Sequence, residues 1–442
     1  MDMAVSEFQQ MRACLKRAKM GSYLMIPLKY ETKSFRPDRM KQSFHPCPIT
    51  TMDLNEPVRE LLNPDTPTRV GECYEIFRED LVRELFDGEA EGIQTFYVLR
   101  DDRSWDEEGM FDFFDSCIYL FHTQVAFLCL GIRYSRITTL TRICNPGFAE
   151  NNAEYGYRDA QGSSQEFSLE SCVSGFCARM GLKAFFAGSP MLLEADTYNV
   201  ALVPQRFSEL ETMQRISFNH HRMVPLEEEM EDKSEYDVRY VYSVRNQELN
   251  TYRWGCCVSS QNVSWVGADE TMDLEGEMHA QARDGLPMLA IALYEKYTCL
   301  HFTRMIASAR EKRSRQIRSL KRLMLEFRAY GTVSPSNISR WHNIKKIYEY
   351  ILETNGIPEA IGDIQDKLNI LIERQQEVEN TRNGMVAGVL TLFGAVSILD
   401  SVLAISQSLM EGGTQNWFIL LATIWVILLV TVLVLVFGGR ED

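Results

Sequence analysis

Two apolar runs near the C-terminus are the clearest feature of the hydrophobic pattern. The run 417–437 (WFILLATIWVILLVTVLVLVF) holds no charge, and a helix needs about 20 apolar residues to cross a bilayer. The run 384–410 is almost as apolar, and apart from small residues only Asp400 and Gln407 interrupt it. We therefore expect two transmembrane helices at 384–410 and 417–437, an external loop at 411–416 and a cytosolic tail at 438–442.

A helix should extend the first apolar run toward the N-terminus. The sequence Asn355-Gly356-Ile357-Pro358 supplies a helix stop followed by a first-turn proline, and no proline follows Pro358. One helix from Pro358 to about Met410 would be roughly 80 Å long at ~1.5 Å per residue. We therefore predict a stalk helix whose cytosolic part, 358–383, continues into the first transmembrane helix.

Apolar residues recur along this helix in alternating steps of four and three. A repeat of about 3.5 residues indicates helices that supercoil around one another, so we expect an oligomer. The stripe contains Ile357, Ile361, Ile364, Leu368, Leu371, Val378, Met385, Val389, Leu392, Val396, Leu399 and Leu403.

A second stripe runs beside the first and is polar, small or hydroxylated. Its cytosolic members, predicted to line a funnel, are Asp366, Asn369, Glu373, Gln376 and Asn380. Its predicted pore-lining members are Asn383, Ala387, Leu390, Gly394, Ser397, Asp400, Ser401 and Ser408. A carboxylate inside a span costs at least ~2.5 kcal/mol and normally faces a cavity or a partner, so Asp400 favours a water-filled axis. A packing seam of small residues stays open as the alternative, and Asp400 and Glu411 are the candidate metal ligands.

The region 1–285 shows a mixed pattern that predicts an α/β cytosolic domain. The segment 117–134 indicates two buried strands around a His-Thr-Gln break. The segment 236–244 alternates with the period of a half-buried strand, and 252–265 is its expected neighbour. Short helices are expected at 58–62 and 73–86.

Helical character begins after Gly285-Leu286-Pro287. Good helix formers without a glycine before Gly331 predict a helical hairpin over 286–357, turning at 331–337. Within it, 310–328 carries eight basic and two acidic residues. This stretch is either a solvated helix face or a patch for anionic membrane lipid or an acidic neighbouring subunit.

The charges near the apolar runs predict the orientation of the chain. Arg374 and Arg382 precede the first run and Arg440 follows the second, whereas the loop 411–416 has no lysine or arginine. Positive residues stay on the cytosolic side, so both termini should be cytosolic. The N-terminal residues lack the apolar core of a secretory signal, so the large head should stay inside.

Composition narrows the classes of function. The chain has 442 residues with 45% hydrophobic and 24% charged residues, which is ordinary for a packed protein. A net charge of −15 argues against direct nucleic-acid binding. The eleven cysteines form no C-x-x-C pair and are odd in number, so we expect reduced and mostly buried thiols.

No enzyme signature is present, and we expect a protein that is not an enzyme. The chain lacks a P-loop, a G-x-S-x-G and an H-E-x-x-H motif, and the pair His220-His221 is expected to face solvent. Guanidinium groups grip phosphate and aromatic rings stack on bases, so a nucleotide-sensing head would use residues of these kinds. Ordinary strand aromatics beside solvated arginines are the alternative for the same set. The candidates are Arg239, Tyr240, Arg245, Tyr252, Arg253, Trp254 and Trp265.

The order of these elements resembles the CorA family of divalent-cation channels. A cytosolic α/β head, a helical hairpin, one long helix that becomes the first span, a short loop and a second span all match, in detail over 286–442. The resemblance implies a homopentamer in a prokaryotic cytoplasmic membrane, with the first span lining the pore and magnesium or another divalent cation as the permeant ion. The family's Gly-Met-Asn signature is missing here, where Gln407-Ser408-Leu409-Met410 stands.

This departure is similar to the variant CorA proteins found beside type III CRISPR systems. That similarity implies a channel gated by a nucleotide second messenger, such as a conjugate of S-adenosylmethionine and AMP, that acts in antiviral defence. A constitutive magnesium or divalent-cation transporter stays open as a second function. A non-conducting membrane-tethered sensor or scaffold is the third, and no resident cofactor is expected in any of them.

Overall fold

The computed structural model describes residues 7–31, 35–67, 69–90, 92–100, 102, 104–144, 155–158, 162–229, 238–243, 245, 248–309, 314–411 and 424–425. The chain divides into two compact units, Met1–Asp366 and Lys367–Asp442, and the division falls within the last long helix. The first unit contains the sheet and is treated first.

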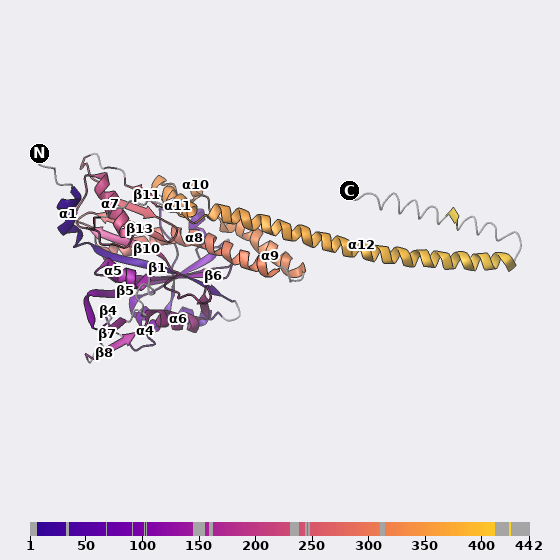
Figure 1. Ribbon diagram of the computed structural model, residues 1–442, viewed down its shortest axis with the longest axis horizontal. Coiled ribbons are helices and arrows are strands. Elements are labelled where there is room, and N and C mark those ends of the chain that lie inside the picture. The colour runs from indigo at the N-terminus through magenta and orange to yellow at the C-terminus, as the bar shows by residue number, and fades with distance from the viewer. Residues whose placement is uncertain are drawn as a thin grey trace. The chain divides into compact units, whose positions relative to one another are not determined.

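Thirteen strands in the described part of the chain form one mixed sheet (Figure 1). The strands are β1 (Lys19–Tyr30), β2 (His45–Pro46), β3 (Gly71–Ile76), β4 (Phe96–Leu99), β5 (Trp105–Phe121), β6 (Val125–Tyr134), β7 (Tyr155–Arg158), β8 (Ser164–Phe167), β9 (Leu182–Ala184), β10 (Asp196–Val203), β11 (Arg239–Tyr242), β12 (Trp254–Val258) and β13 (Asn262–Ala268).

Helices precede, connect and follow these strands, and the last of them continues into the second unit. They are α1 (Glu7–Leu15), α2 (Pro37–Ser43), α3 (Glu56–Glu60), α4 (Arg78–Leu85), α5 (Ile137–Cys144), α6 (Leu169–Met180), α7 (Leu210–His221), α8 (Leu274–Ala309), α9 (Ser314–Glu326), the π-helical turn η1 (Phe327–Gly331), α10 (Pro335–Ile338), α11 (His342–Thr354) and α12 (Ile357–Glu411).

The strand order is β11-β12-β13-β10-β1-β6-β5-β4-β7-β8, with β3 and β2 beyond β5 and β9 beside β1. Only β10 and β13 pair in parallel among these strands. Parallel neighbours need a crossover, and here α7, β11 and β12 intervene in the chain, with α7 packed on β10, β12 and β13. The expected α/β head is therefore a mixed, mostly antiparallel sheet with helices.

The central strands are apolar on both faces because both faces are covered. On one face Leu24, Ile26 and Leu28 of β1 join a core to which α1, α4, α5, α6 and α7 contribute. On the other face, the Tyr23 hydroxyl donates to the Met278 carbonyl of α8 at 3.2 Å. The prediction of two buried strands in 117–134 is confirmed, since β5 and β6 meet at the turn His122–Gln124.

The helix predicted at 73–86 is wrong in its first half. Residues Gly71–Ile76 form β3, which pairs with β5 along its whole length, and only Arg78–Leu85 is helical. Gly71 is required here, because a Cβ at this position would lie 2.7 Å from Cδ1 of Phe121. Pairing with a distant strand decides the conformation, and local sequence does not show it. The helix predicted at 58–62 is present as α3, two residues earlier.

The predicted start of helical structure at 286 is also wrong, because α8 begins at Leu274 and contains Pro287. Gly285 marks a close packing point inside the helix. A Cβ on Gly285 would lie 2.2 Å from the Tyr198 hydroxyl, so glycine lets α8 approach β10. The boundary of the sheet domain therefore lies before 285.

The region 286–357 is more divided than a two-helix hairpin. It contains most of α8, then α9, η1, α10 and α11, and residues 310–313 of the basic stretch lie outside the described residues. The predicted turn at 331–337 is where η1 ends and α10 begins. The single long helix is confirmed, since α12 runs unbroken over Ile357–Glu411 (Figure 1). The predicted loop 411–416 is wrong at its first residue, because Glu411 is the last residue of α12. The rest of the loop, the second span 417–437 and the tail 438–442 lie outside the described residues, apart from helical Ile424 and Trp425.

Candidate functional site

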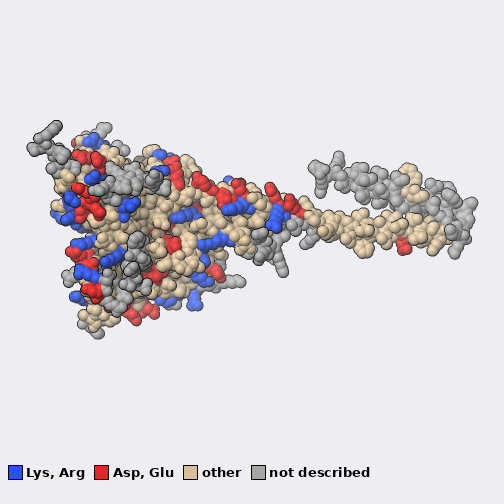
Figure 2. Space-filling view, viewed as in Figure 1, with Lys and Arg blue, Asp and Glu red and all other residues tan. Residues whose placement is uncertain are grey.

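The C-terminal part of α12 is the candidate membrane segment. Within the described residues, Asn383–Gln407 is long and apolar enough to cross a membrane, and none of it is buried inside the chain. In Figure 2 this part of the helix is almost entirely free of charged side chains. Its exposed large apolar side chains are Met385, Val386, Val389, Leu390, Leu392, Phe393, Val396, Ile398, Leu399, Val402 and Leu403.

These apolar side chains point in most directions around the helix axis, since they occupy consecutive as well as i, i+3 and i, i+4 positions. A helix that is apolar on all sides is either buried in protein or surrounded by lipid. Removing such a set of side chains from water is worth on the order of 10 kcal/mol. The segment is therefore compatible with a surrounding of lipid, of other protein, or of both.

Helical structure over Asn383–Ser401 places the predicted pore-lining residues Asn383, Ala387, Leu390, Gly394, Ser397 and Ser401 along one slowly winding side of α12. Asp400 lies three residues after Ser397 and four before Ala404, so it is at the edge of this side. Leu390 is 66% exposed and is the one large apolar residue among the predicted pore-lining positions. In an oligomer, this side could enclose a polar path.

The predicted funnel residues precede this segment on the same helix. Asp366, Asn369, Glu373, Gln376 and Asn380 are all exposed. The stripe is therefore available to water or to neighbouring subunits along its whole length.

Asp400 and Glu411, the predicted metal ligands, are about 16 Å apart along α12 at ~1.5 Å per residue. Equivalent residues of several subunits, and not these two of one chain, would have to form a metal site.

The predicted nucleotide-binding residues lie around β11, β12 and β13. Strand alternation puts Arg239 and Trp254 on the same side as Trp265, because Cys256 pairs with both Val241 and Trp265. Tyr240 lies on the opposite side with Tyr242, toward α7. Arg245 and Tyr252 are in the connection between β11 and β12. The seven residues therefore do not share one face of the sheet.

Arg253 has an intramolecular partner. Its Nε lies 3.1 Å from Oδ2 of Asp269, and Arg206 donates to the same oxygen at 2.9 Å. Asp269 is buried and also accepts from the backbone N–H and hydroxyl of Thr271. Arg253 therefore helps to neutralise a buried carboxylate after β13, a structural role that the sequence pattern did not show.

The pair His220-His221 forms the buried C-terminal end of α7, contrary to the expectation of solvent exposure. Burial lowers the pKa of His220 to about 3 and that of His221 to about 4, so both are neutral at pH 7. The last residues of α7, 216–221, are all buried. The polar sequence NHH at 219–221 did not indicate this burial.

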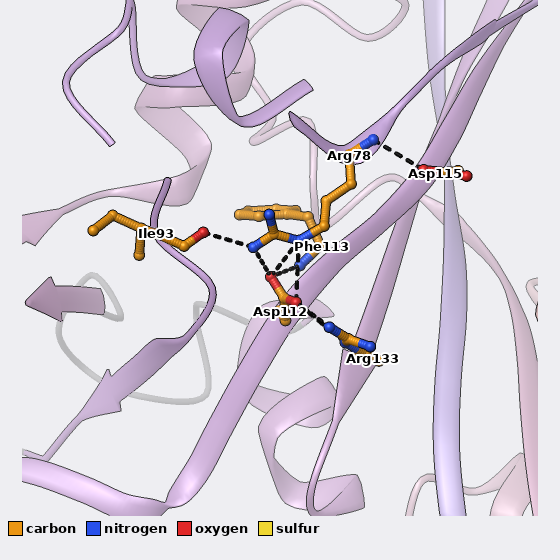
Figure 3. Close-up of polar contacts among 6 residues, drawn as sticks. All are labelled: Arg78, Ile93, Asp112, Phe113, Asp115 and Arg133. Carbon is orange, nitrogen blue, oxygen red and sulfur yellow. Dashed lines mark hydrogen bonds and ion pairs between the residues drawn. The ribbon is translucent and has the colours of Figure 1, made fainter. Parts of the chain in front are cut away.

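Asp112 of β5 is the centre of a cluster of charged side chains in the sheet domain (Figure 3). Arg78 Nη2 donates to Oδ1 at 2.6 Å, and Arg133 Nη2 donates to Oδ2 at 2.6 Å. Arg78 also donates to the Ile93 carbonyl at 2.6 Å, and its backbone N–H donates to Asp115 at 2.9 Å. A register shift in β5 between Phe114 and Cys117 turns Asp115 toward the start of α4.

This cluster ties α4 to β5 and β6. Asp112 is 5% exposed, and both arginines direct their donors at it. A cavity of about 370 Å³ opens beside Asp112 and Arg133, with Lys19, Gln94 and Ser135 on its wall. Because the two guanidinium groups are held by the carboxylate, we assign Asp112 a structural role rather than a ligand-binding one.

Glu295 joins α8 to the helices that precede α12. Its Oε1 accepts from the backbone N–H of Val333 at 2.8 Å and from the Tyr348 hydroxyl of α11 at 3.0 Å. Burial raises the pKa of Glu295 from 4.5 to about 7, although both hydrogen bonds oppose the shift. The next residue on α8, Lys296, binds Asp196 of β10 at 3.0 Å, so α8 is fixed to the sheet and to α11 at neighbouring positions.

Replacing Glu295 with Gln should remove a pH dependence of stability. The folded-state pKa is raised, so the stabilising protonated form is complete below about pH 4.5 and is lost as the pH rises through about 7. For a pKa shift of this size, the free energy of unfolding falls by at most about 3 kcal/mol over this pH range. Urea unfolding at pH 5 and pH 8 measures it: the difference between the two pH values should shrink in Glu295→Gln and persist in Glu353→Gln, a change at an exposed residue of α11. Equal pH dependence in Glu295→Gln and the parent chain would contradict this role.

No family model, no curated protein and no solved structure matches the chain. Within the described residues, no three His, Cys, Asp or Glu side chains gather as metal ligands would. Nine of the eleven cysteines are buried, as the sequence indicated. Asp112 and Glu295 carried no sequence signal, because each depends on partners that lie 15 or more residues away in the chain.

Proposed function

We propose that the chain is a subunit of an oligomeric, cation-conducting membrane channel of the CorA type, regulated by a ligand of its head. The observation that carries the proposal is one stretch of α12, Asn383–Gln407, whose large apolar side chains leave a narrower side of small and hydroxylated residues, with Asp400 at the edge of that side. Lipid explains the apolar side chains, and a polar path explains the carboxylate.

Asp400 separates this proposal from simple anchoring. A packing seam between helices needs small residues, but it gains nothing from a carboxylate that costs at least ~2.5 kcal/mol in a bilayer. Repeated in every subunit, Asp400 would form a ring of carboxylates that attracts cations. The polar stripe from Asp366 to Asn380 would give such a ring a continuous aqueous approach from the cytosol.

One helix cannot enclose a path, so conduction requires several copies. The 3.5-residue repeat of apolar positions on α12 supports helices that supercoil, and the predicted second span 417–437 would surround them on the lipid side. The number five comes from the resemblance to CorA proteins. Gating by a nucleotide messenger and a role in CRISPR-associated defence have the same source, and the missing Gly-Met-Asn signature weighs against constitutive magnesium transport.

The detergent-solubilised protein should therefore be a homopentamer. Mass photometry is expected to return one main species of five 50.9-kDa chains after correction for the detergent. Extraction at alkaline pH should leave the same protein in the membrane pellet, because the apolar part of α12 holds it there. A monomer or dimer, or release into the soluble fraction, would contradict the proposed channel.

A further inference from the structure

A cavity of about 300 Å³ lies in the first unit between the sheet and the α9–η1 segment. The sheet side is formed by the residues just before β3 and by the turn between β5 and β6. The helix side is formed by the end of α9 and by η1, with α8 beneath. The lining includes Arg69, His122, Tyr294, Glu326, Phe327 and Tyr330.

The floor of this cavity is aromatic and fixed. Tyr294 stacks on Phe121 with ring centroids 4.2 Å apart, and Phe327 packs edge-on against Tyr294 at 5.6 Å. Gly331 allows η1 to approach this floor, because a Cβ there would lie 2.8 Å from Phe327 and 2.9 Å from the Tyr294 hydroxyl. A π-helical turn is rare and often found at functional sites.

The rim combines one exposed aromatic ring with hydrogen-bonding groups of both kinds. Tyr330 is 60% exposed and lines the cavity, so its ring is accessible to an occupant. Arg69 can donate only, and the Glu326 carboxylate can accept only. Burial and the nearby Arg69 lower the pKa of His122, which leaves an imidazole able to donate and accept at neutral pH. The charges of Arg69 and Glu326 are balanced by Glu72 and Arg322 at 2.8 Å each.

We propose that this cavity binds a purine nucleoside unit, with the base between Tyr330 and the aromatic floor and its edge at Arg69, His122 and Glu326. Ligand pockets of this kind start at about 300 Å³ and combine apolar walls with a few polar groups. Stacking supplies most of the affinity, and a donor beside an acceptor matches the edge of a base. A phosphate attached to the nucleoside is not needed for binding, since the rim has no net positive charge.

The position of this cavity suits a regulatory site. Its helix side, α9 and η1, continues through α10 and α11 into α12, while its sheet side belongs to the core of the head. An occupant would therefore bias the arrangement of α9 and η1 against the sheet. This consequence, but not the binding itself, rests on the channel proposed above.

Calorimetry on the detergent-solubilised full chain with adenosine, AMP and inorganic phosphate tests the site. Adenosine and AMP should bind with similar affinity and phosphate should not bind. Tyr330→Ala should weaken binding about tenfold, the effect of losing one stacked aromatic ring. Arg69→Gln should weaken it as well, whereas Leu325→Ala, a change at a residue of α9 that is 54% exposed and outside the cavity lining, should bind as the parent does.

Two results would overturn the inference. Absence of saturable heat with both adenosine and AMP would exclude the ligand class, and binding that survives both Tyr330→Ala and Arg69→Gln would exclude the location. Neither result depends on conduction. Ion flux without nucleoside binding would support the proposed channel and contradict the nucleoside site. Nucleoside binding without any ion flux would support the site and contradict the channel.

Discussion

Liposomes that contain the Leu390→Ser protein should leak cations without any added ligand. Leu390 is the one large apolar residue among the predicted pore-lining positions of α12, and a ring of leucines can close a pore by excluding water. A serine hydroxyl would keep that ring wetted. Lowering the free-energy barrier to ion passage by only ~1.4 kcal/mol raises the flux about tenfold, so a large response is expected. Fluorescent-dye quenching in liposomes loaded with a potassium gradient measures it.

Leu392→Ser is the matched control for this experiment. It makes the same chemical change two residues away on α12, and the two leucines are 66% and 67% exposed. Leu392 belongs to the apolar stripe, so its replacement should not open a path. Equal leak from both variants would indicate a damaged membrane segment. No leak from either variant would show that Leu390 does not close the pore.

Replacing Asp112 with Ala should destabilise the sheet domain more than any other single change proposed for it. The carboxylate is 5% exposed and joins the Arg78 and Arg133 side chains, which are 16% and 46% exposed. Removing it leaves the guanidinium of Arg78 enclosed without its partner, and losses of this kind are about 3–5 kcal/mol. Urea unfolding followed by intrinsic fluorescence gives the change in the free energy of unfolding.

Arg133→Gln tests whether the burial of Arg78 is the cause of the large destabilisation expected for Asp112→Ala. Arg133 is half-exposed and can be replaced by water at the carboxylate, so the loss should stay near ~1 kcal/mol or less. If Asp112→Ala costs no more than Arg133→Gln, the cluster contributes little, and Arg78 must be free to reach solvent when Asp112 is absent.

Features that depend on local sequence were predictable here. The continuous helix over Ile357–Glu411 follows from a long stretch without proline and from the spacing of apolar residues. The strands β5 and β6 follow from a buried run interrupted by three polar residues. In these cases the signal and the structure share the same few residues, so no distant partner is needed.

Features that depend on distant partners were not predictable. Gly71–Ile76 is a strand because β5 lies beside it, and Gly285 lies inside a helix at the point where Tyr198 of β10 approaches it. The cavity at Tyr330 joins segments that begin near residue 67 and end near residue 330. Arginine and aromatic residues around β11 and β12 drew attention by composition, but strand alternation separates them onto two faces.

The most direct measurement of the central proposal is the reversal potential of single channels in a potassium chloride gradient across a planar bilayer. The Leu390→Ser protein is expected to conduct with a reversal potential near that of a cation-selective pore. Adding Asp400→Asn should move the reversal potential toward zero, because the ring of carboxylates that attracts cations is gone. Currents that are anion-selective, or a reversal potential that Asp400→Asn leaves unchanged, would contradict a conduction path along this side of α12.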